Sequence, residues 1–249
     1  MTAGAQEVLR PQGIHLAIIP ADPPAHHLVI RYLRQGHVDG VLLISSHLSD
    51  PLPKQLSDLG INAVLSARPG RPIPTSYVDA DQRAGAGLAA EHLVARGCRR
   101  LATISGPLDI PAGQDRLDGF RAGLAAHGHT DVPAIAGDFT RAGGENAVRR
   151  LLADHPDLDG IFVANDLMAE GAVRVLQEQG RRVPDDVAVV GFDDSSAALA
   201  SRPQLTTIRQ PVEEMAAEMA SLLLARIREP HRPTRSIIFQ STLVVRESA

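Results

Sequence analysis

Polar side chains follow two of the apolar runs that are predicted to be strands. Asn165 and Asp166 come directly after GIFVA, and Asp193 and Asp194 come directly after VAVVGF. In open α/β sheets, ligands bind beyond the carboxyl ends of the strands. A carboxylate accepts hydrogen bonds from ligand hydroxyls or amines. These side chains are therefore candidates for a site that binds a polar ligand.

Each of these acids also has a structural interpretation. Asp166 is placed to cap the helix that begins LMAEGAV by accepting backbone N–H hydrogen bonds, and this interpretation is favoured. Asp193 or Asp194 can cap a short helix in SSAALA, which leaves the other acid to accept from a ligand. Arg116 lies in a predicted helix, QDRLDGFRAGL (114–124). It is either a solvated helix residue or a fork-shaped donor to ligand oxygens.

Residues 85–90, GAGLAA, match the GxGxxG/A pattern of dinucleotide-binding turns. That pattern should leave a strand directly, with an acid about 20 residues later at the end of the next strand. Residues 81–84 intervene here, and the next strand ends in SGP (105–107). Close packing of a helix start against a sheet is the better interpretation.

Motifs of common enzymes are not found. The sequence has no GxSxG elbow, P-loop or HExxH pattern, and its ten histidines are scattered. The pairs His26-His27 and His127-Gly-His129 are interpreted as loop or helix-end residues rather than metal ligands. Nothing in the sequence places a nucleophile beside a base. We therefore expect no catalytic residues, no cofactor and no metal site.

Composition limits the class of protein. Among 249 residues, 29 acidic and 25 basic side chains give a net charge of −4. A surface that binds nucleic acid normally has a basic excess, so we do not expect this chain by itself to hold DNA. The single cysteine, Cys98, is interpreted as a packed or surface thiol in a reducing compartment. With no secretion signal and no apolar run near the roughly 20 residues of a membrane span, we expect a cytoplasmic protein.

Six short apolar runs, rich in β-branched residues, predict strands that are buried on both faces of parallel sheets. They are residues 15–20, 40–45, 62–67, 101–106, 160–165 and 187–192. Segments with helical spacing separate them, including 83–96 and 166–179. Gly97, Gly128 and Gly180 stand where the C-caps of helices belong. The alternation predicts an α/β fold made of right-handed βαβ units.

A weak internal repeat suggests two similar lobes, each with its own sheet. VDGVLLIS (38–45) resembles LDGIFVAN (158–165), and each is followed by a helix that ends in glycine and then by another apolar run. The proline-rich stretch 67–76 precedes the first expected crossing between the lobes.

Five segments, taken together, resemble the LacI/GalR family of bacterial transcription regulators. They are AGLAAEHLVARGCRRLATISGP (86–107), QDRLDGFRAGL (114–124), GIFVANDLMAEGAVRVLQEQGRRVPDDVAVVGFDDS (160–195), LTTIRQPVEEMA (205–216) and LVVRESA (243–249). The resemblance implies a type I periplasmic-binding-protein-like fold, in which three crossover strands join two Rossmann-like subdomains with parallel sheets. The expected subdomains are residues 1–79 with 211–236 and residues 80–210 with 237–249.

The resemblance also implies a set of effector-binding positions. Carried over by motif, they are Arg116 of R-x-x-GF, Phe139 of GDFT, Asn165 or Asp166 of AND, Asp193 of GFDD, and Gln210 near the last crossover. Phe139 would be the aromatic ring that stacks on the ligand. Packing of Phe139 in the core beside a strand is an equally good interpretation.

The sequence departs from the family pattern at its start. Family members usually open with a helix-turn-helix and a hinge helix, and neither is seen here. Residues 1–19 resemble the end of the first helix of the sensing domain followed by its second strand, so the first strand is expected to be missing. A missing central strand would expose an apolar sheet edge. We expect the first lobe to be the less stable one, or to be repaired by partner contacts.

The favoured hypothesis is the effector-binding and dimerisation domain of a LacI-type regulator. Its effector would be a small metabolite, with a sugar or sugar derivative as the default for the family. The implied mechanism is closure of a cleft, which changes DNA binding by a helix-turn-helix outside this chain. The implied partners are the effector, a second copy in a homodimer, and DNA only through that missing domain, with no membrane. The alternatives are a solute-binding protein of an uptake system and a small-molecule enzyme on a doubly wound sheet.

Overall fold

The computed structural model of the chain describes residues 1–21, 23–44 and 47–249. They form two compact units: unit 1 is residues 1–80 with 211–239, and unit 2 is residues 81–210 with 240–249. The chain therefore passes between the units three times. The unit boundaries fall at residues 80 and 239 rather than at the expected 79 and 236. The reason is that β9 (Ser236–Phe239) pairs with β3 (Ser76–Ala80) as far as its last residue.

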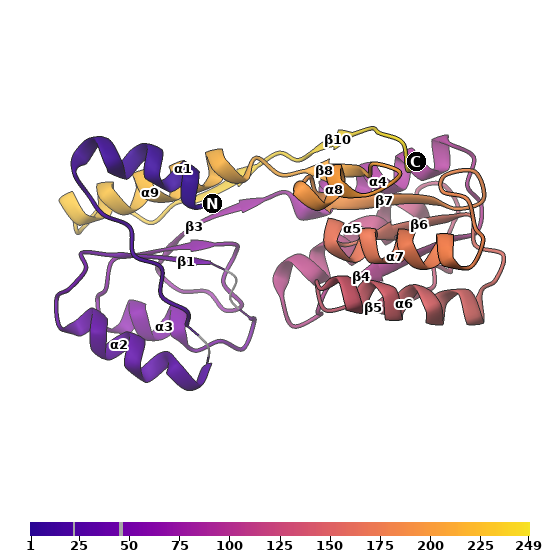
Figure 1. Cartoon of the computed structure of the whole chain (residues 1–249). Helices are drawn as coiled ribbons and strands as arrows, with labels where there is room; N and C mark the ends of the chain where they lie inside the picture. Colours follow the sequence, from indigo (N-terminus) through magenta and orange to yellow (C-terminus); the bar gives the residue numbers. More distant parts are fainter. Residues whose placement is uncertain (22, 45–46) are drawn as a thin grey trace. The chain divides into compact units, whose positions relative to one another are not determined.

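Unit 1 is built on a four-stranded parallel sheet with the order β1-β2-β3-β9. Besides β3 and β9, its strands are β1 (Val41–Ile44) and β2 (Ala63–Ser66). Its helices are α1 (Thr2–Leu9), α2 (His26–Arg34), α3 (Leu52–Asp58) and α9 (Val212–Arg228), with the 3-10 turns η1 (Arg10–Gln12) and η2 (Pro23–Ala25). Helices α1 and α9 pack together on one face of the sheet, and α2 and α3 cover the other face (Figure 1).

The prediction of a strand at residues 15–20 is wrong. These residues form no regular element, and the side chains of Ile18 and Ile19 are 76% and 42% exposed. A strand needs a neighbour to take its backbone hydrogen bonds, and no strand of the described part of unit 1 pairs with this segment. The predicted strand 40–45 is found as β1, although residue 45 lies outside the described residues.

Strand β1 is consequently an edge of the sheet. An apolar groove of about 870 Å³ runs along it, between β1 and residues 13–21, with walls from α1, α2, α3 and α9. Leu16, Val29, Leu42 and Met219 are among the residues that line it. The expected apolar sheet edge in the first lobe is therefore confirmed.

Unit 2 is built on a six-stranded sheet with the order β10-β8-β7-β6-β4-β5. All neighbouring strands are parallel except β10, which is antiparallel to β8. The strands are β4 (Leu101–Ser105), β5 (Ala134–Ala136), β6 (Gly160–Val163), β7 (Ala188–Asp193), β8 (Thr206–Arg209) and β10 (Thr242–Val244). The helices are α4 (Gln82–Ala95), α5 (Pro111–Ala125), α6 (Arg141–Asp154), α7 (Asp166–Glu178) and α8 (Ser196–Ala200).

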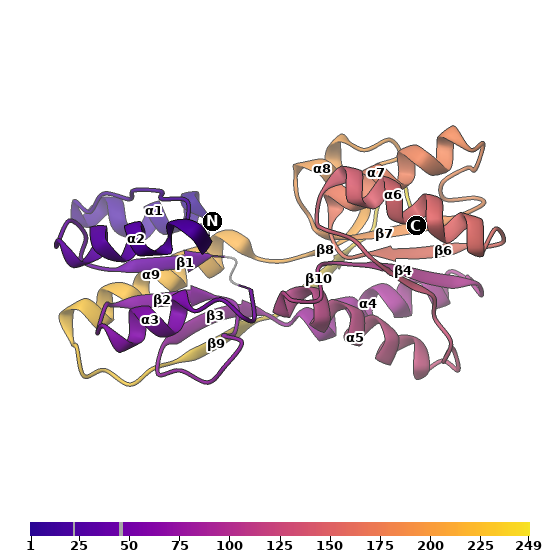
Figure 2. The same ribbon diagram turned by 90° about the horizontal axis from the view of Figure 1, so that it is seen from below.

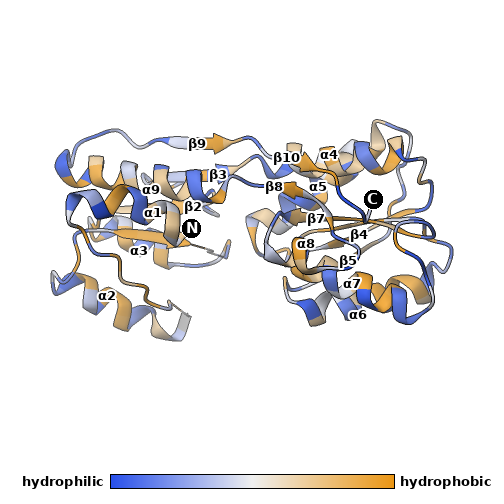
Figure 3. Ribbon diagram, turned by 45° about the horizontal axis from the view of Figure 1, so that its top comes forward, coloured by the Kyte–Doolittle hydropathy of each residue, from blue (hydrophilic) through white to orange (hydrophobic). Residues whose placement is uncertain are grey.

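The sheet of unit 2 is buried on both faces. Helices α4 and α5 cover one face, and α6 and α7 cover the other (Figure 2). Phe162 of β6 stacks on Phe120 of α5 at 4.8 Å between ring centroids, whereas its neighbours Ile161 and Val163 point into the core beneath α6 and α7. Successive side chains of a strand point to opposite faces, so a strand covered on both sides is apolar at every position. Figure 3 shows this hydrophobic colouring along the strands of unit 2.

The helix boundaries follow local signals in the sequence. Gly97, Gly128 and Gly180 have φ values of 94°, 85° and 77°, as expected for glycines that end helices. The GAGLAA segment lies inside α4. A Cβ at Gly85 would come within 3.0–3.1 Å of side-chain atoms of Ser241, Ile208 and Phe192, so the glycine lets the helix pack closely on the sheet. None of the described helices is long and apolar enough to span a bilayer.

We expect unit 1 to unfold before unit 2, because the groove leaves apolar side chains of unit 1 in water. The chain has no tryptophan, and its only two tyrosines, Tyr32 and Tyr77, both lie in unit 1. In a urea titration, tyrosine fluorescence should therefore change at a lower urea concentration than far-UV circular dichroism, which reports on both units. Coincident transitions would show that the two units unfold as one cooperative body and would contradict this expectation.

Candidate functional site

Arg116 is the centre of a polar cluster in unit 2. It lies in α5, the helix that follows β4, and the whole residue is only 5% exposed. The ring of Phe192 lies 3.8 Å from the guanidinium carbon, in a cation–π contact. Arg116 is therefore not a solvated helix residue. A buried guanidinium requires polar partners, because an unpaired buried charge is costly.

Four side chains form a closed ring of polar contacts around this guanidinium. Arg116 Nε donates to Gln82 Oε1 at 2.8 Å, and Gln82 Nε2 donates to Gln210 Oε1 at 3.0 Å. Gln210 Nε2 donates to Asp193 Oδ1 at 2.7 Å, and the same oxygen lies 3.2 Å from Arg116 Nη1. Arg116 Nη1 also donates to the carbonyl of Ala164 at 2.5 Å. The fold thus brings together three predicted residues, Arg116, Asp193 and Gln210.

Asp193 is the member of the ring that can accept from a ligand. Its side chain is 32% exposed. The contacts above all use Oδ1, and within the described residues no hydrogen bond to Oδ2 is found. Desolvation raises the pKa of Asp193, and the charge of Arg116 and the hydrogen bond from Gln210 act in the opposite direction. A ligand hydroxyl that donates to Oδ2 would stabilise the carboxylate further.

The backbone at the end of β7 is strained. Asp193 and Asp194 have φ values of 104° and 55°. A left-handed backbone in residues other than glycine costs about 1–3 kcal/mol each and is found mostly at functional sites. Neither acid caps α8, contrary to the prediction: the cap is Ser195, whose Oγ accepts from the backbone N–H of Ala197 at 3.3 Å.

Asn165 holds the backbone of Phe139 and is not a member of the ring around Arg116. It is the N-cap of α7, where its Oδ1 accepts from the backbone N–H of Met168 at 2.9 Å. Its Nδ2 donates to the carbonyl of Phe139 at 3.0 Å, and Phe139 has a φ of 65°. The Phe139 ring centroid lies 5.9 Å from the guanidinium carbon of Arg116, and the ring also packs against the core. The ring is therefore placed beside the polar cluster, and its stacking on a ligand stays a prediction.

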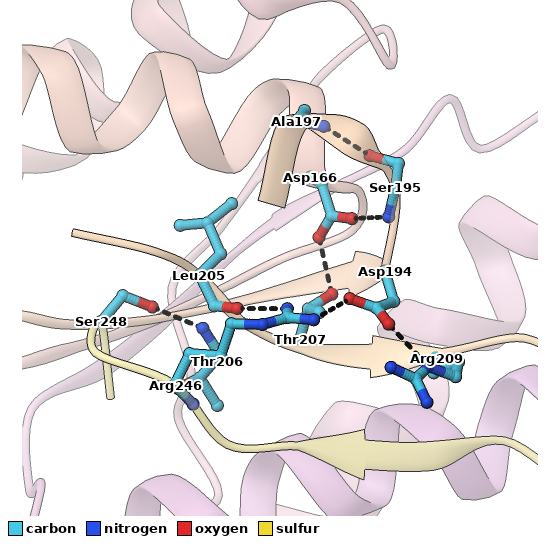
Figure 4. A network of polar contacts seen from close by, with 10 residues as sticks. All are labelled: Asp166, Asp194, Ser195, Ala197, Leu205, Thr206, Thr207, Arg209, Arg246 and Ser248. Carbon is cyan, nitrogen blue, oxygen red and sulfur yellow. Dashed lines mark hydrogen bonds and ion pairs between the residues drawn. The ribbon is translucent and has the colours of Figure 1, made fainter. Parts of the chain in front are cut away.

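Asp166 does not cap α7, so this prediction is wrong. Asn165, one residue earlier, has the extended backbone that a cap requires. Asp166 is fully buried: Oδ1 accepts from the Thr207 hydroxyl at 2.6 Å and Oδ2 accepts from the backbone N–H of Ser195 at 2.7 Å (Figure 4). Burial raises the pKa of Asp166 to about 6 despite these two hydrogen bonds. Asp166 supports the turn after β7, and its oxygens are used within the protein.

Gln82 is the site residue that the sequence analysis does not identify. It is the first residue of α4, directly after Asp81, whose side chain caps that helix. Its position just beyond the end of β3 is the signal that could have found it, because the same kind of position identifies Asn165 and Asp193. Among the described side chains, no group of three His, Cys, Asp or Glu is arranged to hold a metal ion.

Comparisons with known proteins agree with this architecture. A family model described as a periplasmic binding protein-like domain matches residues 90–249. The HTH-type transcriptional regulator CelR of Thermobifida fusca is 46% identical over 228 residues, which cover 90% of this chain and 67% of that protein. A ribose operon repressor of Halalkalibacterium halodurans is 34% identical over 220 residues, which cover 88% of this chain and 65% of that protein. The chain therefore spans about two thirds of the length of these curated relatives.

A solved structure gives a likeness over the whole chain. The complex of the transcriptional regulator CelR with cellobiose has a TM-score of 0.96 and 42% sequence identity. The structural match covers 100% of this chain and 77% of the CelR chain. The periplasmic-binding-protein-like α/β fold with two subdomains, expected from the sequence, is thereby confirmed.

Between about pH 4 and pH 6, the ionisation of Asp166 should make the stability of the unmodified chain depend on pH. The Asp166→Asn variant should lack this contribution. In the unfolded chain this carboxyl ionises near pH 3.8, whereas in the folded chain it ionises near pH 6. The folded state therefore binds more protons in that interval, so this residue's contribution to stability falls as the pH rises, by up to about 3 kcal/mol. An asparagine can accept from Ser195 and donate to Thr207, so both contacts can persist.

Urea titrations of the two proteins at pH 4 and pH 7 check this expectation. The free energy of unfolding of the unmodified chain, minus that of Asp166→Asn, should be larger at pH 4 than at pH 7. A stability difference between the two proteins that does not change with pH would contradict the assigned ionisation of Asp166.

Proposed function

Because this chain belongs to the LacI family of transcriptional regulators, we propose that it is the effector-sensing domain of such a regulator and that its effector is a sugar. The observation that carries the proposal is the ring of Arg116, Gln82, Gln210 and Asp193. A guanidinium only donates hydrogen bonds and a carboxylate only accepts them. Together they match sugar hydroxyls, each of which both donates and accepts.

Cellobiose, a disaccharide of glucose, is the first candidate effector. The regulator of the solved cellobiose complex is 42% identical to this chain and has the same fold throughout. Ribose is the second candidate, because the ribose operon repressor is 34% identical. Of the two rings beside Arg116, Phe192 is fully buried, so Phe139 is the one that can lie against the apolar face of a sugar.

We propose that the sugar acts by shifting a conformational equilibrium. A ligand favours the conformation that it binds more tightly. In a complete regulator this shift would change the affinity for DNA, and DNA would change the affinity for sugar by the same factor. The net charge of −4 is consistent with DNA binding by another part of a longer protein. Such a regulator would act in the cytoplasm, and we propose that it does so as a homodimer.

The two alternative functions receive less support. A solute-binding protein would share the fold, but the relatives that match 88–90% of this chain are named as regulators. An enzyme needs a reactive group within reach of a substrate. The two acids Asp193 and Asp166 instead have partners within the protein: Asp193 contacts Arg116 and Gln210, and Asp166 contacts Thr207 and Ser195.

Isothermal titration calorimetry with cellobiose tests the proposal. We expect a one-to-one complex, and we expect Asp193→Ala to weaken binding by about 2–3 kcal/mol, or roughly 30- to 150-fold. The reason is that the sugar loses an acceptor and Arg116 loses its charged partner. Asp186→Asn is a matched control, because Asp186 pairs with Arg182 outside the ring and its removal should leave the affinity unchanged.

Two results would contradict the proposal. Absence of heat with cellobiose, ribose and other common sugars would exclude the sugar-sensing function. Equal affinities of Asp193→Ala and the unmodified chain, at unchanged melting temperature, would exclude Asp193 from the site.

A further inference from the structure

Asp194 is a buried acid next to the proposed ligand-binding acid, and it is held by two arginines. Its side chain is 7% exposed. Its Oδ2 lies 2.6 Å from Arg209 Nε, and its Oδ1 lies 2.5 Å from Arg246 Nη2. Figure 4 shows the carboxylate between the two guanidinium groups. We call this arrangement of Asp194, Arg209 and Arg246 the arginine clamp.

Both arginines of the clamp are fixed to the sheet of unit 2. Arg209 is the last residue of β8 and is the register partner of Asp193 in β7. Arg246 follows β10, and its backbone N–H donates to the hydroxyl of Thr206 at 2.9 Å. Its Nη1 donates to the carbonyl of Leu205 at 2.9 Å, and its side chain is only 13% exposed. The clamp therefore ties the end of β7 to β8 and to the segment after β10.

Three successive residues, the last of β7 and the two that follow it, are each held by a different contact. Asp193 is held by Gln210, Asp194 by the arginine clamp, and the backbone N–H of Ser195 by Asp166. The first two have positive φ values. A left-handed backbone in residues other than glycine persists only where the surroundings over-determine it.

The clamp is the contact best suited to hold that backbone. Burial alone would raise the pKa of Asp194, but the hydrogen bonds and charges of Arg246 and Arg209 lower it overall. Asp194 is therefore ionised at neutral pH, and both of its contacts are charge-assisted, which makes them stronger than neutral hydrogen bonds. Within the described residues, the contacts of Asp194 are with Arg209 and Arg246, outside the ring, so it affects the ring indirectly. Its chain neighbour Asp193 is the most direct route to the ring.

We propose that Asp194 is a positioning residue of the sugar site. Its clamp holds the left-handed turn that directs the Asp193 carboxylate toward Arg116 and the ligand. The identity of the ligand rests on the proposed function, whereas the clamp and the turn are properties of the free protein. A site held in its binding geometry before the ligand arrives has less ordering cost at binding.

A double-mutant cycle in the whole chain tests the proposal, with cellobiose as the probe. Asp194→Asn keeps the size of the side chain and tolerates a positive φ, but it removes the charge that holds the arginines. We expect it to raise the cellobiose Kd about tenfold in the unmodified chain and less than about twofold in an Asp193→Ala background, because coupled residues are not additive. Asp186→Asn, which also removes an acid paired with an arginine, should change neither Kd.

A second measurement needs no ligand and separates this proposal from the proposed function. Asp194→Asn should speed amide hydrogen exchange at Ser195, Ala197 and Ala198. The N–H of Ser195 donates to Asp166 Oδ2, and those of Ala197 and Ala198 donate to the side-chain and backbone oxygens of Ser195. Exchange in α6 should not change. If no sugar binds the unmodified chain, the proposed function fails and this exchange result alone decides the role of Asp194.

Two outcomes would overturn the proposal. Unchanged exchange in the turn would show that the clamp does not hold it. An equal loss of cellobiose affinity in both backgrounds would show that Asp194 acts on the fold in general and not through Asp193.

Discussion

A guanidinium removed from water must be paired, and in unit 2 this requirement falls on Arg116. An unpaired buried charge costs several kcal/mol. The partners of Arg116 come from separate segments: Gln82 from the start of α4, the Ala164 carbonyl from the end of β6, and Asp193 from the end of β7. The constraint therefore fixes how these strand ends and helix starts meet, and the rest of the site depends on it.

Polar residues around these partners mainly hold them in place. In each of the adjacent pairs Asn165-Asp166 and Asp193-Asp194, the two residues have different partners. Asn165 holds the backbone beside Phe139, while Asp166 points into the protein toward Thr207. Asp193 completes the ring, while Asp194 is held by arginines from β8 and the segment after β10. We propose that the ligand contacts Asp193, whereas Asp166 and Asp194 have partners within the protein.

Local patterns in the sequence were sufficient to predict much of the fold. Continuous apolar runs identify β2, β4, β6 and β7, because strands covered on both faces have no polar side. Helix-ending glycines at 97, 128 and 180 are found where expected, because only a left-handed residue ends these helices well. The run at 15–20 has the same composition as a strand, but composition cannot supply the neighbour that a strand requires.

The site was predictable in position but not in detail. Polar residues after strand ends led to Asp193, which lies in the polar ring around Arg116, and to Asn165, which holds the backbone of Phe139; their contact with a ligand stays a prediction. The roles within each pair depend on partners far along the chain, since Thr207 lies 41 residues from Asp166 and Gln210 lies 128 residues from Gln82. No local pattern distinguishes a cap at residue 165 from one at residue 166. The partner that is distant in sequence determines which residue of a pair caps the helix, and only the folded structure shows that partner.

The most direct test of the sugar site is a crystal structure of this chain grown with cellobiose. The account predicts sugar hydroxyls within hydrogen-bond distance of Asp193 Oδ2 and the Arg116 guanidinium, with Phe139 against one face of the sugar. Cellobiose bound elsewhere, with Asp193 and Arg116 in contact only with protein, would contradict it.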